Sequence, residues 1–343
     1  MNDDIYYMQR ALSLAAKGLG TTSPNPMVGA VLVKENVILG EGWHIRAGEG
    51  HAEVNAFADA AKKGNDVKGA ILYVTLEPCS TRGRTAACTD AIIAAKVKKV
   101  VIGCLDPNPK HAGRGVEILE KAGIEVVSNI LKKECQQINE GFFHWITTGR
   151  PFVVLKIAQT LDGKIACYNG KSQWITGKEA RKRVMQLRLW ADCVVTGGST
   201  FRIDHPRFTV RDEEGNILKT PRRIVVTTRV EEMRKIAPSG ENWEFVTLED
   251  KDAWDKFLLK LGKENVTGIL LECGGFLASS ALAAKVVNKV EFHIAPKILG
   301  GEKSILSISG NSPENLDEAY TLEDVKYTQY GKDLAFSGMV KYK

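Results

Sequence analysis

The pattern of hydrophobic and polar residues in the first half of the chain switches repeatedly between helical and strand-like periods. Apolar residues share one helical face over 4–17, and an apolar run over 28–33 resumes at 37–39 after Glu35-Asn36, which predicts a β-hairpin. Further helices are predicted over 52–63, 89–95, 113–122 and 131–146, and strands over 70–76, 100–103 and 124–127. This order is typical of an α/β sandwich with a largely parallel sheet.

The second half repeats this alternation after a break at Thr147-Thr148-Gly149-Arg150-Pro151. A near-continuous apolar run over 152–158 is typical of a buried strand. Further strands are predicted over 193–196, 223–227, 268–272 and 290–295, and helices over 178–190, 252–261 and 277–287. Because a chain of 343 residues suits two domains, we expect one α/β domain over 1–147 and another over 151–343.

Composition narrows the class of protein. A hydrophobic fraction of 44% and a charged fraction of 26% are ordinary for a soluble globular protein. No stretch approaches the roughly 18 apolar residues of a membrane span, and no signal peptide is visible. The net charge of +6 is spread without long basic runs, so small anionic ligands are favoured as partners, with no nucleic acid and no membrane. Seven cysteines, an odd number, favour metal ligation in a reducing cytoplasm over disulfides.

The strongest chemical signal lies between His51 and Cys88. His51, Cys79 and Cys88 are ligands of the type that zinc prefers, and three ligands leave a fourth position open, which marks a catalytic site. Glu53 is predicted on the first helical turn, rotated by roughly 200° from the direction of His51, and acts beside the metal as general acid and base. A lone His or Cys is usually an ordinary packed residue. The four residues together, in this order, match the zinc deaminases and predict catalytic zinc.

The gap between the two cysteines separates families of deaminases. Enzymes that act on nucleic acids or free nucleosides usually have two residues there, whereas eight residues separate Cys79 from Cys88. Together with SPNPMVGA at 23–30 and DPNP at 106–109, this segment resembles the deaminase half of the bifunctional riboflavin-biosynthesis deaminase/reductase family. The resemblance implies a cytidine-deaminase-like fold and a pyrimidine substrate that bears a phosphoribosylamino group. It also implies that Asn25 and His44 contact this substrate.

The chain departs from the family pattern without losing a metal ligand or Glu53. Thr81 stands where His is expected, Thr85-Ala86-Ala87 where Thr-Pro-Pro is expected, Gly50 where Pro is expected and Asn55 where His is expected. Arg82 and Arg84 are candidates to bind the sugar phosphate instead, because a guanidinium binds phosphate bidentately. The alternative for both arginines is a solvated loop.

Two strands of the second half run into glycine pairs, Gly197-Gly198 and Gly274-Gly275. Glycine lets a phosphate approach the backbone, and the N-terminus of a following helix offers free N–H groups. Each pair alone is more often just a turn, and no Gly-x-Gly-x-x-Gly follows a strand, so a Rossmann domain is not indicated. Lys156, the one charge within 152–158, either reaches past the sheet to water or presents a cation to the substrate.

With LDGKIA at 161–166 and SQWIT at 172–176, these turns resemble the reductase half of the same family, which is similar in fold to dihydrofolate reductase and uses NADPH. The resemblance implies cofactor contacts by Ala158, Trp174, Thr200, Asp204, Gly274, Gly275, Phe276, Leu277, Ala278, Ser279 and Ser280. It implies substrate contacts by Ser172, Arg188, Phe208, Arg211 and Glu272. Arg188 and Arg211 could also hold a ribose phosphate, and Trp174 offers a flat face to a ring. For Phe208, core packing is an equal alternative.

These observations predict a cytoplasmic, homo-oligomeric enzyme of riboflavin biosynthesis with two activities. The first is zinc-dependent hydrolytic deamination, and the second is reduction of the ribosyl chain by NADPH, in which the sequence does not decide between Lys156 and Asp204 as the proton donor. One alternative is a nucleic-acid or nucleoside deaminase with a C-terminal binding domain, but this class favours the two-residue gap and a basic stripe with aromatics. The other is a non-enzymatic, zinc-stabilised protein that retains the fold.

Overall fold

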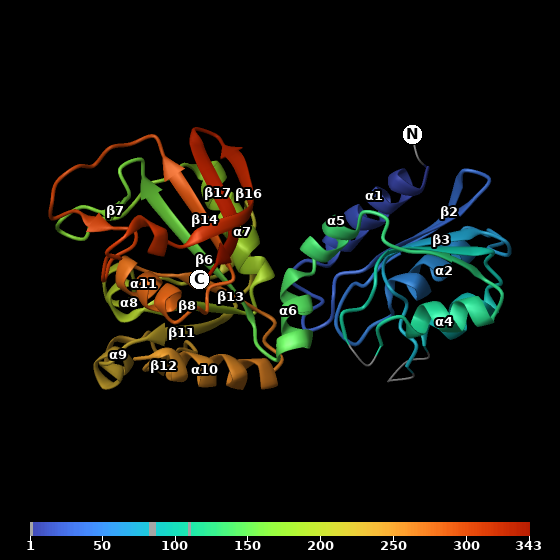
Figure 1. Ribbon diagram of the computed structural model, residues 1–343, viewed down its shortest axis with the longest axis horizontal. Helices are drawn as coiled ribbons and strands as arrows, with labels where there is room; N and C mark the ends of the chain where they lie inside the picture. The colour runs from blue at the N-terminus through green and yellow to red at the C-terminus, as the bar shows by residue number, and fades with distance from the viewer. Residues whose placement is uncertain (1–2, 82–86, 109–110) are drawn as a thin grey trace. The chain divides into compact units, whose positions relative to one another are not determined.

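The computed structural model describes residues 3–81, 87–108 and 111–343 (Figure 1). The chain forms two compact units, Met1–Gly149 and Arg150–Lys343. No helix among the described residues is both long enough and apolar enough to cross a membrane.

The first unit contains a five-stranded sheet of mixed direction. Its strands lie in the order β2 (Val37–Trp43), β1 (Gly29–Lys34), β3 (Ile71–Leu76), β4 (Lys99–Cys104), β5 (Glu125–Val127). β1 is antiparallel to both β2 and β3, whereas β3, β4 and β5 are parallel. The predicted hairpin of 28–33 with 37–39 is present as β1 and β2, joined by the turn Glu35-Asn36 with positive φ at both residues. The expectation of parallel strands holds for β3, β4 and β5, whereas the antiparallel pairing of β1 with β3 was not predicted.

Helices cover both faces of this sheet, because alternate residues of each strand point to opposite sides. On one face, Ala30 and Leu32 pack with residues of α2 (Ala52–Lys62), α3 (Cys88–Ala94) and α4 (Arg114–Lys121). On the other face, Val31 and Val33 pack with α1 (Asp3–Ala15) and with Cys135 of α5 (Lys132–Gln137). A Cβ at Gly42 would lie 2.3 Å from the backbone N of Ala56, so β2 lets α2 approach at backbone distance. This close packing fixes the helix that begins directly after His51.

The predicted helix over 131–146 is two helices, α5 and α6 (Glu140–Thr148), with a break at Asn139. The Asn139 side chain accepts a hydrogen bond from Met27 N at 2.7 Å and donates one to Met27 O at 2.8 Å. Because the buried amide of Asn139 is hydrogen-bonded to a distant segment, it competes with continuation of the helix at this point. The break therefore ties the end of the first unit to the segment that carries Asn25.

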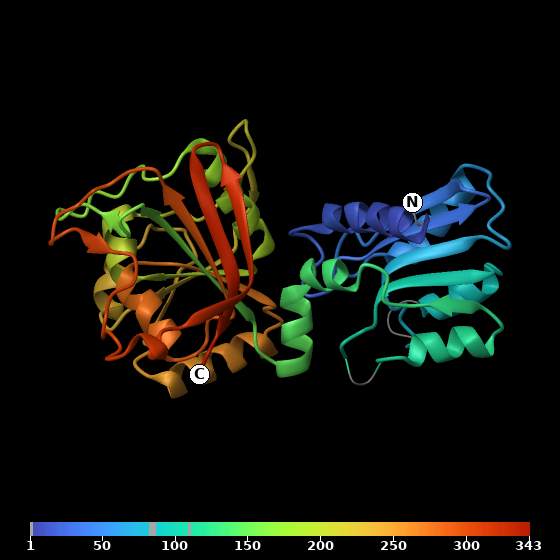
Figure 2. The same cartoon turned by 45° about the horizontal axis from the view of Figure 1, so that its top comes forward.

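The second unit is built on an eight-stranded sheet. Its strands lie in the order β12 (Glu244–Val246), β11 (Arg222–Val226), β8 (Cys193–Gly197), β13 (Gly268–Glu272), β6 (Phe152–Thr160), β14 (Lys289–Ala295), β17 (Asp333–Lys341), β16 (Thr321–Tyr330). The first six are parallel, and β17 and β16 add an antiparallel hairpin, drawn in red in Figure 2. Two-stranded additions come from β7 (Lys164–Ala166) with β15 (Ile305–Leu306) and β9 (Val210–Arg211) with β10 (Ile217–Lys219).

Helices again lie on both faces of the larger sheet. α10 (Lys251–Lys263) and α11 (Gly275–Ala283) bury apolar residues against one face, in a core that includes Leu155 and Leu271. α7 (Lys178–Trp190) covers the other face, where Leu187 packs with Val154 and Leu270. The short helices α8 (Gly198–Asp204) and α9 (Val230–Ile236) complete the unit. α8 and α11 begin where the parallel strands end, which is the usual position of ligand sites in such sheets.

Candidate functional site

The three predicted metal ligands converge in the first unit. His51 caps the N-terminus of α2, Cys79 follows β3, and Cys88 is the first residue of α3. Their donor atoms all lie within 4.8 Å of one another; His51 Nδ1 is 3.2 Å from Cys88 Sγ and 3.5 Å from Cys79 Sγ. A tetrahedral zinc with bonds of about 2.1 and 2.3 Å separates an imidazole nitrogen from a thiolate sulfur by about 3.6 Å. The donor set and its spacing therefore fit zinc.

The two thiols interact with each other and can give up their protons when a metal binds. The backbone N–H of Cys88 donates to Cys79 Sγ at 3.3 Å. The hydrogen bond from the Cys88 thiol, aided by His51, lowers the pKa of Cys79, whereas the same hydrogen bond and burial raise the pKa of Cys88. The lowered pKa of Cys79 favours its thiolate form, and metal binding displaces the proton that Cys88 keeps.

Glu53 lies beside the ligands. The side chain is buried and interacts with Cys88, which places it against the cluster. The rotation of roughly 200° assumed that His51 belongs to the helix, whereas His51 has extended backbone angles, φ −71° and ψ 165°, and stands outside the helical spiral. Burial raises the pKa of Glu53 above its usual value. A raised pKa suits a carboxyl group that takes up and releases a proton in turn.

Asn25 and His44 are brought together next to His51. The rings of His44 and His51 meet edge to face with centroids 5.5 Å apart. His44 Nδ1 is 3.1 Å from Gly50 O, an acceptor, so this nitrogen carries the proton and Nε2 accepts from Asn25 Nδ2 at 3.1 Å. Burial lowers the pKa of His44, which keeps the ring neutral in this arrangement. Arg84 and Arg82, the candidates for phosphate binding, lie outside the described residues.

Two departures from the family pattern fit each other in space. The Asn55 amide donates to Trp43 O at 2.7 Å and to Gly50 O at 3.1 Å. A Cβ at position 50 would lie 2.8 Å from Asn55 Oδ1. Gly50 thus leaves room for Asn55, and Asn55 holds the chain directly before His51. Neither departure weakens the ligand geometry.

Glu77, which the sequence did not single out, organises the wall beside Cys79. This buried carboxylate accepts backbone N–H groups from Asp106 at 3.1 Å, Gly113 at 3.0 Å and Gly115 at 2.8 Å. A Cβ at Gly115 would lie 2.4 Å from Pro78 O, so α4 begins in close contact with the ligand segment. One signal in the sequence could have identified Glu77. It is a charged residue between a buried strand and a Pro-Cys pair, whereas charged residues are usually exposed to solvent.

In the second unit, Lys156 and Glu272 occupy paired positions on β6 and β13. Arg188 of α7 forms a bidentate ion pair with Glu272, with distances of 2.6 and 3.0 Å. Although burial raises the pKa of Glu272, Arg188 outweighs it and the pKa falls below the usual value. Burial lowers the pKa of Lys156. The Nε and Nη2 groups of Arg188 are thus engaged by Glu272, and its role in holding a phosphate stays a prediction.

Other predicted reductase residues also meet. Ser172 Oγ donates to Asp204 Oδ1 at 3.1 Å, which joins a predicted substrate residue to a predicted cofactor residue. Burial raises the pKa of Asp204. A Cβ built on Gly274 would find only Thr200 Oγ1 at 3.7 Å, so the backbone of Gly274 stands in open space. Thr200 lies in the first turn of α8 and Gly274 caps the start of α11, where a ligand can reach free N–H groups, whereas Asp204 is the last residue of α8.

The side chains along α11 separate into two groups. Phe276 is 78% exposed, whereas Ala278 is completely buried in the core. The prediction that Ala278 contacts the cofactor is therefore not supported by the position of its side chain, because α11 packs this position against the sheet. Gly275 is also confined, since a Cβ there would lie 2.5 Å from Leu306 O. Its missing side chain serves the packing of residues 306–309. Leu277, Ser279 and Ser280 are partly exposed.

Phe208 packs in the core of the second unit, which was one of its two predicted roles. The ring is 4% exposed and packs with Phe152 and Val154, while Arg188 stacks over it at 5.2 Å from the ring centre. Arg211 is exposed, and its Nε donates to Thr209 Oγ1 at 3.1 Å. Trp174 is 64% exposed with the Arg181 guanidinium 4.6 Å from its ring centre, so one flat face is already partly covered. Ala158 is partly exposed on β6.

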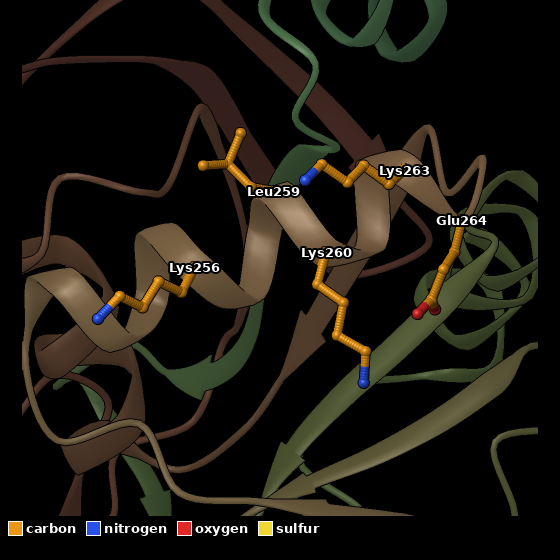
Figure 3. A pocket seen from close by; sticks show the side chains of 5 residues that line it. All are labelled: Lys256, Leu259, Lys260, Lys263 and Glu264. Atoms are coloured by element: carbon orange, nitrogen blue, oxygen red, sulfur yellow. The ribbon is translucent and has the colours of Figure 1, made fainter.

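A surface hollow of about 400 Å³ lies along α10, and no predicted site residue lines it (Figure 3). Its lining consists of Lys256, Leu259, Lys260, Lys263 and Glu264. Lys256 pairs with Asp252 at 2.6 Å, and Glu264 pairs with Arg222. The hollow is therefore an ordinary charged helix surface with no part in the chemistry described above.

Two family models match the chain. Residues 1–104 match the cytidine and deoxycytidylate deaminase zinc-binding region, and residues 151–336 match the RibD C-terminal domain. The riboflavin biosynthesis protein RibD of Actinobacillus pleuropneumoniae is 40% identical over 98% of this chain and 95% of its own length. The protein of the same name from Escherichia coli K12 is 42% identical over 87% of this chain and 89% of its own length.

Solved structures show the same similarity in three dimensions. Acinetobacter baumannii RibD is 35% identical with a TM-score of 0.85, covering 98% of this chain and 99% of its own. The diaminohydroxyphosphoribosylaminopyrimidine deaminase/5-amino-6-(5-phosphoribosylamino)uracil reductase of Thermotoga maritima is 33% identical with a TM-score of 0.86, covering 98% and 99%. These matches confirm the predicted fold class, a cytidine-deaminase-like α/β/α sandwich followed by a reductase α/β domain. The chain therefore belongs to the RibD family, the bifunctional zinc-dependent deaminases and reductases of riboflavin biosynthesis.

Proposed function

We propose that residues 1–147 carry the deaminase and residues 151–343 carry an NADPH-dependent reductase, and that the two act in succession on one phosphoribosylated pyrimidine. The substrate is 2,5-diamino-6-(5-phosphoribosylamino)pyrimidin-4-one, and the product is 5-amino-6-(5-phosphoribitylamino)uracil. The observation that carries the first assignment is the convergence of His51, Cys79 and Cys88, with Glu53 buried against them.

In the deaminase, His51 Nδ1 and the two cysteine sulfurs would hold zinc, which would lower the pKa of a water molecule. Glu53 would take a proton from the attacking water and pass it to the amino group, which leaves as ammonia while the water oxygen takes its place on the ring. The raised pKa of Glu53 suits this cycle, because the same carboxyl must accept and donate within one turnover.

Asn25 and His44 orient the pyrimidine. Because Asn25 Nδ2 donates to His44, the amide is fixed with Oδ1 directed away from this bond and free to accept from a ring or amino N–H. His44 in turn is fixed by Gly50 O. This chain of hydrogen bonds favours a substrate edge that donates, as the diaminopyrimidine does.

In the reductase, a bound NADPH would supply the hydride for the sugar carbon of the ring-opened ribose, and the protein supplies orientation, charge and a proton. Gly274 and Thr200 offer an open backbone and a hydroxyl at the start of α11 and α8 for the cofactor phosphates. The Lys156 ammonium would donate a proton to the sugar oxygen, and the hydrogen-bonded pair of Ser172 and Asp204 would orient substrate and cofactor. Free thiols at all seven cysteines suit a cytoplasmic location.

The test is a coupled assay on the full chain. The diaminopyrimidine substrate is supplied with and without NADPH, and ammonia release and NADPH oxidation are followed together. We expect ammonia in both reactions and NADPH oxidation that begins only after a lag in which the deaminated product accumulates. NADPH oxidation without prior ammonia release would contradict the proposed order, and NADH oxidation at an equal rate would contradict the cofactor. Light scattering on the same sample measures whether the enzyme is the expected homo-oligomer.

A further inference from the structure

A row of polar side chains crosses the apolar sheet of the second unit beneath α7. Glu272 of β13, Lys156 of β6 and Glu291 of β14 are neighbours in register on three adjacent strands. Thr196 of β8 lies one position beyond the pairing of Val195 with Leu271, so it continues the row next to Glu272. Positions two residues earlier on the same face, such as Val154 and Leu270, belong to the core under α7. Four polar side chains at one level of a buried face require a reason.

Each glutamate of the row is held by its own arginine from α7. Arg188 pairs bidentately with Glu272, and Arg183 pairs bidentately with Glu291, with both distances at 3.0 Å. Glu291 Oε1 also lies 2.9 Å from Nε2 of His293, which is completely buried. His293 and Arg183 lower the pKa of Glu291 to about 2 despite its burial, so this carboxylate is ionised at any working pH.

Lys156 stands between these two carboxylates without joining either. Among the described residues, no carboxylate lies within ion-pairing distance of the Lys156 ammonium, because the arginines occupy the oxygens of Glu272 and Glu291. The ammonium is thus stabilised by two negative charges while its N–H donors stay unengaged. Such an arrangement keeps a cation charged in a poorly solvated place and available to a ligand.

We infer that Glu291 and Arg183 are positioning residues of the reductase, which act through Lys156 by keeping its ammonium charged and unpaired in the substrate site. This inference rests on the proposed role of Lys156. Glu291 supplies the second negative charge that stabilises the Lys156 ammonium. Arg183 binds Glu291 and so prevents an ion pair between Glu291 and Lys156. The charged and titratable groups that face Lys156 in this row are Glu272, Glu291, His293, Arg183 and Arg188.

Substitutions of Glu291 and Arg183 should shift the pH profile of reduction in opposite directions. Activity needs the ammonium form, so kcat/KM falls as the pH rises through the pKa of Lys156. Glu291→Gln removes an attractive charge and moves this alkaline limb to lower pH, by roughly one to two units for a charge about 7 Å away at an effective dielectric constant of about 20. Arg183→Met unmasks Glu291, moves the limb to higher pH, and lowers kcat because Lys156 now pairs with Glu291.

The experiment uses the full chain, the deaminated pyrimidine 5-amino-6-(5-phosphoribosylamino)uracil and NADPH, across a pH series. Glu323→Gln, which breaks an exposed ion pair with Lys341 on the β16–β17 hairpin, is the matched control and should leave the limb unchanged. Opposite shifts in Glu291→Gln and Arg183→Met support the inference. An unshifted limb in both variants, including the case in which kcat and thermal stability merely fall together, overturns it.

A fallback and one further variant keep this test decisive. If Glu291→Gln does not fold, Arg183→Met alone carries the test, since its upward shift has no explanation in lost stability. Lys156→Met separates the inference from the proposed function. Full activity with a wild-type limb in this variant removes Lys156 from the reductase mechanism, whereas loss of activity in Lys156→Met with unshifted limbs in the other two variants refutes only the positioning role.

Discussion

Glu77→Ala should destabilise the deaminase unit far more than any surface substitution. The carboxylate accepts three backbone N–H groups at 2.8 to 3.1 Å, and truncation leaves all three donors unpaired. Each unpaired buried donor costs about 1–3 kcal/mol, and the partial exposure of Asp106 places the sum near the lower end, at about 3–5 kcal/mol. For a unit of this size, that cost lowers the melting temperature by about 10–15 °C.

Calorimetry on the zinc-loaded full chain measures this effect. Glu77→Gln keeps the shape but turns one acceptor into a donor, so we expect a loss about half as large. Glu125→Gln is the matched control, because its ion pair with Lys99 is exposed and contributes less than about 1 kcal/mol. Reduction of the deaminated pyrimidine should be unaffected in all three variants. A Glu77→Ala protein that melts with the wild type would refute the view that this carboxylate holds the loop and α4 in place.

Three further predictions concern the sites themselves. Glu53→Gln should keep about one zinc per chain by elemental analysis while ammonia release falls by about 10²–10⁴-fold, and persistent deamination would remove Glu53 from its role. Cys79→Ala should lose the zinc, because two remaining ligands cannot hold it, and full retention of metal would contradict the ligand assignment. Gly275→Ala should cost about 1–3 kcal/mol of stability, since its Cβ meets Leu306 O at 2.5 Å, whereas Gly274→Ala should keep stability and raise the KM for NADPH. Equal melting temperatures for the two glycine variants would show that Leu306 moves aside.

Residue types and their order were enough to predict the metal ligands, because zinc chemistry admits few donor sets. The direction of Glu53 was not predictable in the same way. It depends on whether His51 belongs to the helix or caps it, and the extended backbone of His51 places this residue outside the helix. The same limit applies to Gly275, whose missing side chain serves a backbone segment about thirty residues later in the chain.

Strands that are buried on both faces were the easiest to predict. β6 and β13 are buried almost throughout, so their apolar runs stand out. The β16–β17 hairpin was missed because β16 is an edge strand with nearly every residue at least partly exposed, which removes the alternation that marks a strand. The break at Asn139 was also missed, since its cause is a hydrogen-bond partner 112 residues away.

The hydrogen bonds between Met27 and Asn139 set the shortest N-terminal fragment in which the segment with Asn25 is anchored. The segment with Asn25, near the start of the chain, is anchored through Met27 to an amide that the ribosome delivers more than a hundred residues later. A nascent chain that has emerged only as far as α5 therefore has all three metal ligands but an unanchored substrate segment. A fragment that ends at residue 137, before Asn139, should bind zinc and turn over poorly, and extension to residue 149 should restore the activity.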